Sequence, residues 1–284
     1  MYIATVAFSA CGGCENSLLS AGEPLVSLLS EHTVSFSSLL VDTRSVSPSD
    51  VVLASGCIRN SQEREVALEI ARTSRKIVAV GTCAVYGGIG GLRMLEPAEE
   101  GEGSNGVLPE LFEKALPLDS IMGVELFVPG CPPPSNLIME ALKSVLEGYT
   151  PLHFESTVCS DCTRRVARKK LKSVHGHPGP GVADNACLLN AGVLCMGPVT
   201  RGGCRAACPR AGTACLGCRG PSDAVLSSQL HSMHSDMVSV IARTSGARED
   251  KVAQLLDPLR EMMYLFTTAD PVTRGRVKER VPGE

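Results

Sequence analysis

The sequence predicts an α/β protein whose N-terminal half is built on a parallel sheet, followed by a cysteine-rich region of less regular structure. Three observations lead to this fold class. Short apolar runs alternate with amphipathic segments up to about residue 150, the chain then changes character, and 13 of its 284 residues are cysteines. Strands that alternate with helices are typical of parallel sheets, whose ligands lie at the carboxyl ends of the strands. We therefore expect two domains, residues 1–150 and 151–284.

Apolar, β-branched runs mark the expected strands of the first domain. They are Tyr2–Phe8, Thr33–Val41, Val51–Ala54, Lys76–Val80 and Val124–Val128. Two segments, Ser61–Ser74 and Ser135–Gly148, have apolar residues at helical spacing and are expected to be helices. Ser135 is expected to cap the second of these helices, and Gly148 is expected to end it.

Cysteines follow four of the five expected strands. Cys11 and Cys14 come after the first strand, Cys57 after the third, Cys83 after the fourth and Cys131 after the fifth. Because the carboxyl ends of parallel strands meet at one edge of a sheet, we expect these cysteines to converge there. Four thiolates around one cavity suit a 4Fe–4S cluster, and the neighbouring glycines would let backbone amides donate to sulfur. Four cysteines also bind zinc, and scattered buried cysteines are a third interpretation.

Eight further cysteines lie in a segment rich in glycine and proline. They form two candidate sets, Cys159, Cys162, Cys187 and Cys195, and then Cys204, Cys208, Cys215 and Cys218. Such a segment is not expected to assemble a large apolar core, so metal would have to hold it together. Each set alone fits zinc as well as a cluster. Three sets in one short chain favour an electron-transfer wire, because zinc has no redox chemistry. Beyond them, Ala224–Ala242 and Arg248–Thr267 are expected to be helices.

Composition excludes several classes of function. The net charge of −3 gives no electrostatic reason to expect a nucleic-acid partner or an anionic membrane. No segment has the roughly 18 uncharged apolar residues that a membrane span needs. The first residues contain no basic n-region and no twin arginine. We therefore expect a cytoplasmic protein, in which clustered cysteines bind metal rather than form disulfides.

These cysteine motifs resemble those of the small subunits of nickel–iron hydrogenases, over about residues 1–220. The motifs are C-x-x-C-E at Cys11–Glu15, G-T-C-A at Gly81–Ala84 and P-G-C-P-P at Pro129–Pro133. The resemblance implies a flavodoxin-like first domain. It also implies a proximal 4Fe–4S cluster, next to the nickel–iron site of the large subunit, on Cys11, Cys14, Cys83 and Cys131. The chain would then relay electrons from hydrogen oxidation and would not itself split hydrogen.

The resemblance also divides the later cysteines into two clusters. A medial 4Fe–4S cluster would use Cys204, Cys208, Cys215 and Cys218, and a distal 4Fe–4S cluster Cys159, Cys162, Cys187 and Cys195. Many members have proline where this chain has Cys208, and they carry a 3Fe–4S medial cluster. Periplasmic members often have histidine in the place of Cys159. The spacing between Cys187 and Cys195 departs slightly from the common pattern.

Two residues are left beside these sets. Glu15 matches a glutamate that the family has near the proximal cluster and the subunit interface, where it would transfer protons. The alternative is an acidic residue in the first turn of a helix, where the helix dipole favours it. Cys57 would either replace one expected proximal ligand or be a buried free thiol.

The cytoplasmic, methanogen-type branch (group 3) of the family is the most similar, over Gly81–Leu92 and Leu216–Pro221. The implied partners are a nickel–iron large subunit and an electron-acceptor subunit, an iron–sulfur or flavin protein such as a heterodisulfide reductase complex. A deazaflavin-reducing enzyme is the alternative within this branch. The small subunit of respiratory complex I is disfavoured by the eight later cysteines, and a zinc-stabilised interaction protein remains a different class. We expect the chain to be poorly soluble without its large subunit.

Overall fold

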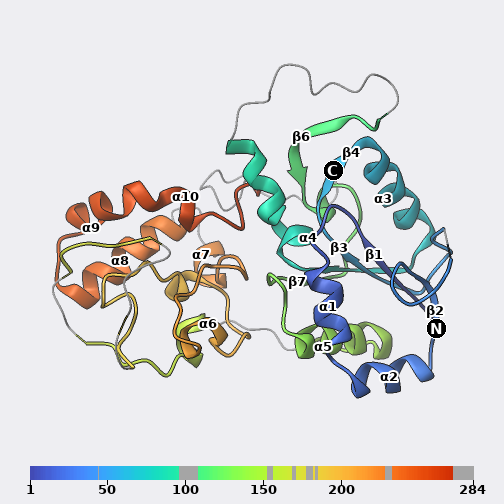
Figure 1. Ribbon diagram of the computed structural model, residues 1–284, viewed down its shortest axis with the longest axis horizontal. Coiled ribbons are helices and arrows are strands. Elements are labelled where there is room, and N and C mark those ends of the chain that lie inside the picture. The colour runs from blue at the N-terminus through green and yellow to red at the C-terminus, as the bar shows by residue number, and fades with distance from the viewer. Residues whose placement is uncertain are drawn as a thin grey trace. The chain divides into compact units, whose positions relative to one another are not determined.

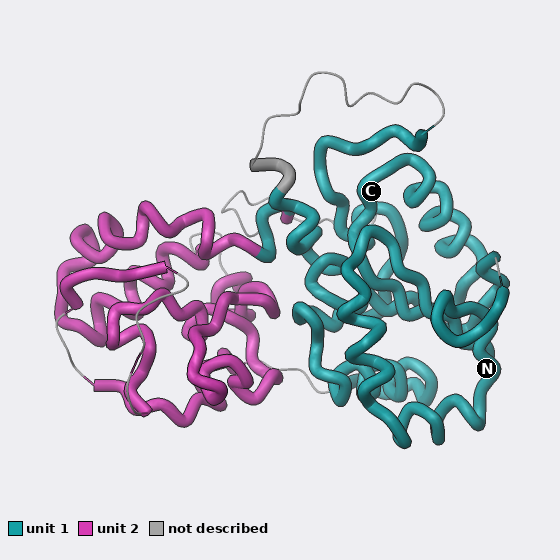
Figure 2. The backbone as a smooth tube through the Cα atoms, viewed as in Figure 1, with its two compact units in different colours: residues 1–153, 266–269 teal, residues 154–265, 270–284 magenta. Residues whose placement is uncertain are grey.

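The computed structural model describes residues 1–43, 45–95, 108–151, 156–167, 171–176, 182, 185–227 and 232–270. The chain forms two compact units (Figure 2). The first unit comprises residues 1–153 and 266–269, and the second comprises residues 154–265 and 270–284. Residues 266–269 thus belong to the first unit, although they follow residues 154–265 of the second unit in the sequence.

Five parallel strands form the centre of the first unit. They are β1 (Tyr2–Ala7), β2 (Thr33–Ser37), β3 (Val51–Ser55), β5 (Lys76–Val80) and β7 (Leu126–Val128). Their order across the sheet is β2-β1-β3-β5-β7, and all neighbouring pairs are parallel (Figure 1). This order is that of flavodoxin-like folds, so the predicted fold class is confirmed. Three strands are shorter than predicted: β1 ends at Ala7, β2 ends at Ser37, and β7 begins only at Leu126.

Helices cover both faces of this sheet. One face packs against α1 (Gly13–Leu19), α2 (Glu23–Ser30) and α5 (Ser135–Glu147), and the other against α3 (Ser61–Thr73) and α4 (Thr82–Tyr86). Successive residues of a strand point to opposite faces. In β3, Val51 and Leu53 therefore belong to the first core, and Val52 and Ala54 to the second. Burial on both faces explains why this strand is a continuous apolar run.

The ends of α5 test two predictions about capping. Ser135 does not cap the helix: it is the first helical residue, and Pro134 occupies the capping position without a side-chain hydrogen bond. The prediction was wrong because Pro134 already holds the backbone in the extended conformation that precedes a helix, with φ −55° and ψ 140°. Gly148 ends the helix in the left-handed conformation, with φ 78°, as predicted.

A small antiparallel pair extends the first unit. It joins β4 (Ile58–Asn60) to β6 (Leu111–Leu116). Two 3₁₀ helices, η1 (Gly88–Leu95) and η2 (Leu118–Ser120), lie on either side of β6 in the sequence. Because β4 follows β3 almost at once, Cys57 lies in the short connection between two strands.

Helices of 3 to 13 residues form the regular part of the second unit. They are η3 (Val158–Asp161), η4 (Gly197–Val199), α6 (Ala207–Arg210), α7 (Asp223–Leu226), α8 (Met233–Ser245), α9 (Glu249–Leu256), η5 (Asp257–Leu259) and α10 (Arg260–Met263). The two helices predicted here, Ala224–Ala242 and Arg248–Thr267, were wrong in their bounds. In the first, α7 ends at Leu226 and α8 begins only after Ser232, which forms a capping box with Ser235. In the second, Pro258 lies in η5, the short 3₁₀ helix that separates α9 from α10.

An apolar core nevertheless holds the second unit together, contrary to prediction. Met237, Ile241 and Leu256 of α8 and α9 are at most 1% exposed. They belong to the same buried cluster as Leu194 and Met196 from the cysteine-rich segment. The prediction considered the cysteine-rich segment alone, whereas its apolar partners come from helices later in the chain.

Candidate iron–sulfur cluster sites

Four cysteines line one cavity at the carboxyl edge of the parallel sheet. The lining consists of Ala10, Cys11, Gly13, Cys14, Gly56, Thr82, Cys83, Gly130, Cys131 and Pro132. These residues lie on the segments that follow β1, β3, β5 and β7. The convergence expected from the strand order is therefore present for Cys11, Cys14, Cys83 and Cys131.

Local backbone geometry sets the positions of these cysteines. Gly12, in the left-handed conformation with φ 77°, precedes α1, so Cys11 lies just before the helix and Cys14 within it. Thr82, which precedes Cys83, donates its N–H to the carbonyl of Gly130 at 2.9 Å. Its hydroxyl accepts the N–H of Gly130 at 2.8 Å. Two hydrogen bonds thus tie the segment that carries Cys83 to the segment that carries Cys131.

Two thiols of this set, those of Cys14 and Cys83, are biased towards their neutral form in the chain alone. Burial raises the pKa of Cys14 to about 12, and the nearby Glu15 and the other three cysteines add to the shift. Burial also raises the pKa of Cys83, but the backbone N–H groups of Ile89 and Gly90 act in the opposite direction by donating to its sulfur. Iron would have to displace these protons, and amide donors of this kind are the ones that stabilise cluster thiolates. The donor set therefore fits a cluster.

Glu15 has a partner that was not predicted from the sequence. The hydroxyl of Ser55, at the end of β3, donates to one carboxylate oxygen of Glu15. The other carboxylate oxygen is buried and makes no hydrogen bond within the described part of the chain. The only signal in the sequence was a serine at the end of an otherwise apolar strand, which is too common to be informative.

Cys57 lies apart from the lining of this cavity. It is fully buried, and its thiol points to the carbonyl of Ser9 at 3.7 Å. Burial raises its pKa to about 12, with a further contribution from Cys83, so the two thiols are near one another. This geometry agrees with a buried free thiol better than with a ligand of the first set.

In the second unit, one of the two predicted sets is assembled around Cys159. Burial raises the pKa of Cys159 to about 12, and the neighbouring thiols of Cys195, Cys187 and Cys162 raise it further. Burial likewise raises the pKa of Cys195, while the backbone N–H groups of Gly197 and Cys215 donate to its sulfur and oppose the rise. Cys162, Cys187 and Cys195 are therefore close enough to Cys159 to raise its pKa.

The remaining cysteines of the second unit lie in two close pairs. The pKa of Cys208 is raised by burial and by Cys204. The pKa of Cys215 is raised well above its usual value by burial, with Cys195 and Cys218 adding to it. Between Cys204 and Cys208 the chain turns through two consecutive left-handed residues, Arg205 with φ 53° and Ala206 with φ 49°. Such non-glycine conformations cost energy and are frequent at functional sites.

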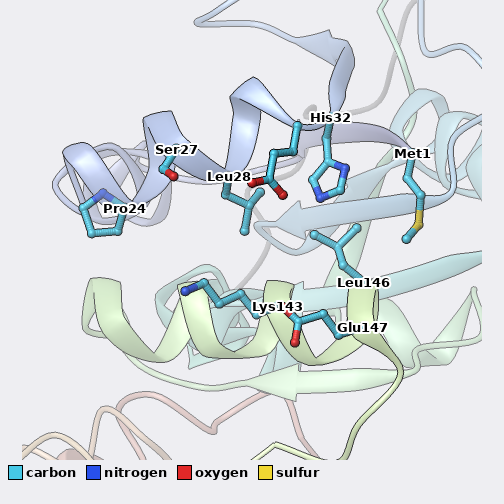
Figure 3. A pocket seen from close by; sticks show the side chains of 9 residues that line it. Met1, Pro24, Ser27, Leu28, His32, Lys143, Leu146 and Glu147 are labelled. Carbon is cyan, nitrogen blue, oxygen red and sulfur yellow. The ribbon is translucent and has the colours of Figure 1, made fainter.

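A second cavity lies at the opposite end of the sheet, near the start of β1. Its volume is about 370 Å³, and side chains of α2 and α5 face each other across it (Figure 3). Met1, Pro24, Ser27, Leu28, Glu31, His32, Lys143, Leu146 and Glu147 line it. No cysteine contributes to this lining, and it shares no residue with the cysteine-lined cavity.

Two features are absent from the described residues. No three His, Cys, Asp or Glu side chains in them are arranged to hold a single metal ion. None of the helices they form has the length and apolar character that crossing a membrane requires.

Comparison with known proteins places this geometry in a family. Residues 11–145 match the family model of the NADH ubiquinone oxidoreductase 20 kDa subunit. The vhu G subunit of the F420-non-reducing hydrogenase of Methanococcus voltae is 34% identical over 266 residues, which cover 87% of this chain and 88% of that protein. The delta subunit of sulfhydrogenase 2 of Pyrococcus furiosus is 30% identical, over 75% of this chain and 83% of that protein.

Solved structures agree on the fold. A chain of the [NiFeSe] hydrogenase of Desulfovibrio vulgaris Hildenborough superposes with a TM-score of 0.52 at 17% identity, covering 78% of this chain and 93% of that one. Since the sequence relatives extend well beyond residue 145, they account for both units, whereas the family model accounts for the first unit alone. The chain therefore belongs to the family of the iron–sulfur small subunits of the F420-non-reducing hydrogenases.

Proposed function

We propose that this chain carries three 4Fe–4S clusters and relays electrons from a nickel–iron large subunit to an acceptor subunit. The proximal cluster would be bound by Cys11, Cys14, Cys83 and Cys131. The medial cluster would be bound by Cys204, Cys208, Cys215 and Cys218, and the distal cluster by Cys159, Cys162, Cys187 and Cys195. The observation that carries the proposal is the cavity at the sheet edge, because cysteines from three separate segments line it together.

The chain's own residues would perform three tasks. Bound clusters supply one-electron transfer. Around them, cysteine sulfurs would hold the iron, and N–H groups such as those of Ile89 and Gly90 would stabilise the negative charge on sulfur. Glu15, held by Ser55 beside Cys14, would accept and release a proton at its carboxylate next to the large subunit.

The proposed partners follow from the family. The large subunit would hold the nickel–iron site, and the acceptor would be an iron–sulfur or flavin protein of the cytoplasm, such as a heterodisulfide reductase complex. Two relatives that are 34% and 32% identical are named F420-non-reducing. The gamma subunit of the coenzyme F420 hydrogenase of Methanosarcina barkeri is 28% identical. We therefore favour the group 3 branch that does not reduce the deazaflavin.

The first test is to purify the complex anaerobically through a tag on this chain and to measure iron, acid-labile sulfide, zinc and nickel. We expect about twelve irons and as many sulfides per chain, with nickel in the partner subunit. Cys131→Ala and Cys187→Ala should each remove about four irons, since each loses one ligand of a different set. Cys57→Ala is the matched control, and it should leave the iron content unchanged.

Two results would contradict the proposal. About three zinc ions without sulfide would identify a zinc-stabilised interaction protein instead. Loss of iron in Cys57→Ala, together with retention in Cys131→Ala, would mean that the proximal ligands are assigned wrongly. Because the variants alter separate units, failure of one to assemble leaves the other as a test.

A further inference from the structure

We propose that residues 266–269 form a clasp that holds η1 against Cys83 and so positions this ligand of the proximal cluster. This inference rests on the proposed function, since it requires a cluster on the first set of cysteines. It goes further by giving a role to a segment that contains no cysteine and that follows most of the second unit in the sequence.

The start of η1 lies directly against Cys83. The N–H of Gly87, the residue before η1, donates to the carbonyl of Cys83 at 2.9 Å. A Cβ atom built on Gly88 would lie 2.5 Å from the Cys83 sulfur and 2.7 Å from its Cα, so only a glycine fits there. No residue of η1 is among those that line the cysteine cavity. The 3₁₀ helix therefore contacts Cys83 from outside the cavity.

The middle of η1 is fixed by other parts of the first unit. A Cβ atom built on Gly90 would lie 2.6 Å from the sulfur of Cys57, so these two residues are in close contact. The guanidinium of Arg59, on β4, donates to the carbonyl of Gly90 at 2.8 Å. The N–H of Arg59 in turn donates to the carboxylate of Glu63, on α3, at 2.8 Å. These contacts tie η1 to β4 and, through it, to α3.

The clasp contacts η1 through Ala269. A Cβ atom built on Gly91 would lie 2.8 Å from the Cβ of Ala269 and 3.0 Å from its backbone nitrogen. A Cβ atom built on Gly87 would lie 2.5 Å from the same methyl group of Ala269. The three residues before Ala269 in the clasp are each at most 7% exposed. Ala269 therefore packs closely against the glycines at both ends of the first turn of η1.

This packing gives the clasp a route to the proximal cluster. The side chain of Ala269 has neither charge nor hydrogen-bonding group, so it can affect a cluster only by packing. Close-packed interiors transmit small displacements, and a shift of η1 would move the backbone of Gly88 relative to the Cys83 sulfur. The dipoles around a ligating sulfur and its exposure to solvent help to set the reduction potential of a cluster. The clasp would therefore influence the proximal cluster and not the other two.

The test changes the sizes of two touching residues in the assembled, anaerobically purified complex. Gly91→Ala places a methyl group against Ala269, and Gly91 is not among the glycines with positive φ, so the obstacle is steric. Gly91→Ala combined with Ala269→Gly removes the opposing methyl group. Gly123→Ala is the matched control in the same unit, because a Cβ atom there would meet nothing within 4 Å and its φ is not positive either.

Hydrogen exchange of the amides in residues 88–95 is the first readout, because it does not depend on a loaded cluster. We expect Gly91→Ala to make this exchange roughly tenfold faster, which is within the usual cost of overpacking. The double variant should recover most of the protection. Gly123→Ala should match the unaltered complex.

The second readout is the midpoint potential of each cluster, from redox titration followed by electron paramagnetic resonance. Gly91→Ala should shift the potential of the proximal cluster, identified as the signal that Cys131→Ala removes, and leave the other two unchanged. The double variant should return the proximal potential towards that of the unaltered complex. A merely structural role of the clasp would change stability without a selective shift of one potential.

Several outcomes would overturn the inference. Unchanged exchange in Gly91→Ala, or a double variant no closer to the unaltered complex than the single variant, would show that Ala269 does not hold η1. An unshifted proximal potential in a loaded Gly91→Ala complex would show that η1 does not position Cys83. If Gly91→Ala does not assemble, assembly of the double variant supports the clasp, and failure of both contradicts it.

The same measurements separate this inference from the proposed function. If the unaltered complex contains no iron and sulfide, the proposed function and this inference fail together. Unshifted potentials in a loaded complex defeat only the inference.

Discussion

The two units of this chain bring cysteines together by different means. In the first unit, the cysteines follow parallel strands whose ladder of hydrogen bonds places four segments at one edge. In the second unit, the cysteines lie on irregular segments that include two left-handed residues in succession. The regular strands are held by the continuous ladder of the sheet. The irregular segments are held by single backbone hydrogen bonds and by the apolar core that they share with α8 and α9. The comparison teaches that one chain can bring cysteines together at the edge of a regular sheet and, elsewhere, on irregular segments that pack against helices from later in the chain.

Removal of iron should give the largest difference between the units. We expect anaerobic chelation of the purified complex to abolish the hydrogen-exchange protection of residues 185–222, while β1, β3 and β5 keep most of theirs. The reason is that metal binding supplies folding free energy to small metal-bound segments, and the parallel sheet has its own core on each face. The measurement is hydrogen exchange followed by mass spectrometry, before and after chelation.

The helices α8 and α9 provide an internal reference for that measurement. They share the apolar core of the second unit, so their protection should fall less than that of the cysteine-rich segment. Equal loss of hydrogen-exchange protection in both units would mean that the first unit depends on metal as much as the second. That result would contradict the prediction.

Core substitutions should separate the units with a smaller effect. Leu142 of α5 and Met237 of α8 are each at most 1% exposed, in different cores. Leu142→Ala and Met237→Ala should each destabilise their own unit by roughly 2–5 kcal/mol, the usual cost of such a cavity. Hydrogen exchange in each unit of the loaded complex measures the change.

A surface substitution in the first unit is the control for these variants. Val26 of α2 is 68% exposed, and Val26→Ala should change the stability by no more than about 0.5 kcal/mol. If Met237→Ala also weakened protection across β1, β3 and β5, the two units would have to be treated as one cooperative body.

The smallest predicted effect is a pH dependence confined to the second unit. Burial and the nearby Arg260 lower the pKa of His234, while Asp257, with an oxygen 3.4 Å from the imidazole, opposes them. The unfolded chain therefore binds a proton at a pH where the folded chain does not. Stability is then full above the usual histidine pKa and falls as pH drops below it, towards the folded-state pKa. We expect this loss to be smaller than the effects of the core substitutions, because only one partly buried group titrates.

His234→Gln tests this prediction. The melting temperature of the second unit should fall between pH 7 and pH 5.5 in the unaltered complex and should fall less in the variant. An identical pH response in both proteins would show that His234 does not contribute.

Much of the first unit could be predicted from the sequence. The apolar runs that became β1, β3 and β5 are largely buried, and burial on both faces makes such strands visible as continuous apolar stretches. The pattern of strands was therefore sufficient to predict that Cys11, Cys83 and Cys131 lie at one edge of the sheet. The second unit was predicted less well, because its core joins the cysteine-rich segment to helices that begin after residue 222. The spacing of apolar residues within one segment does not show which distant segment packs against it.

The sequence by itself determined the fold class and the grouping of the cysteines that follow the strands, since strand patterning and local spacing are properties of neighbouring residues. Only the tertiary structure decided that Cys57 lies outside the lined cavity, that Ser55 donates to Glu15 and that the N–H of Cys215 donates to the sulfur of Cys195. Each of these contacts joins residues of different segments, and its existence depends on side-chain packing and on the direction of single hydrogen-bonding groups. Such contacts leave no regular pattern in a sequence, because each is made once, in one place, by the completed fold.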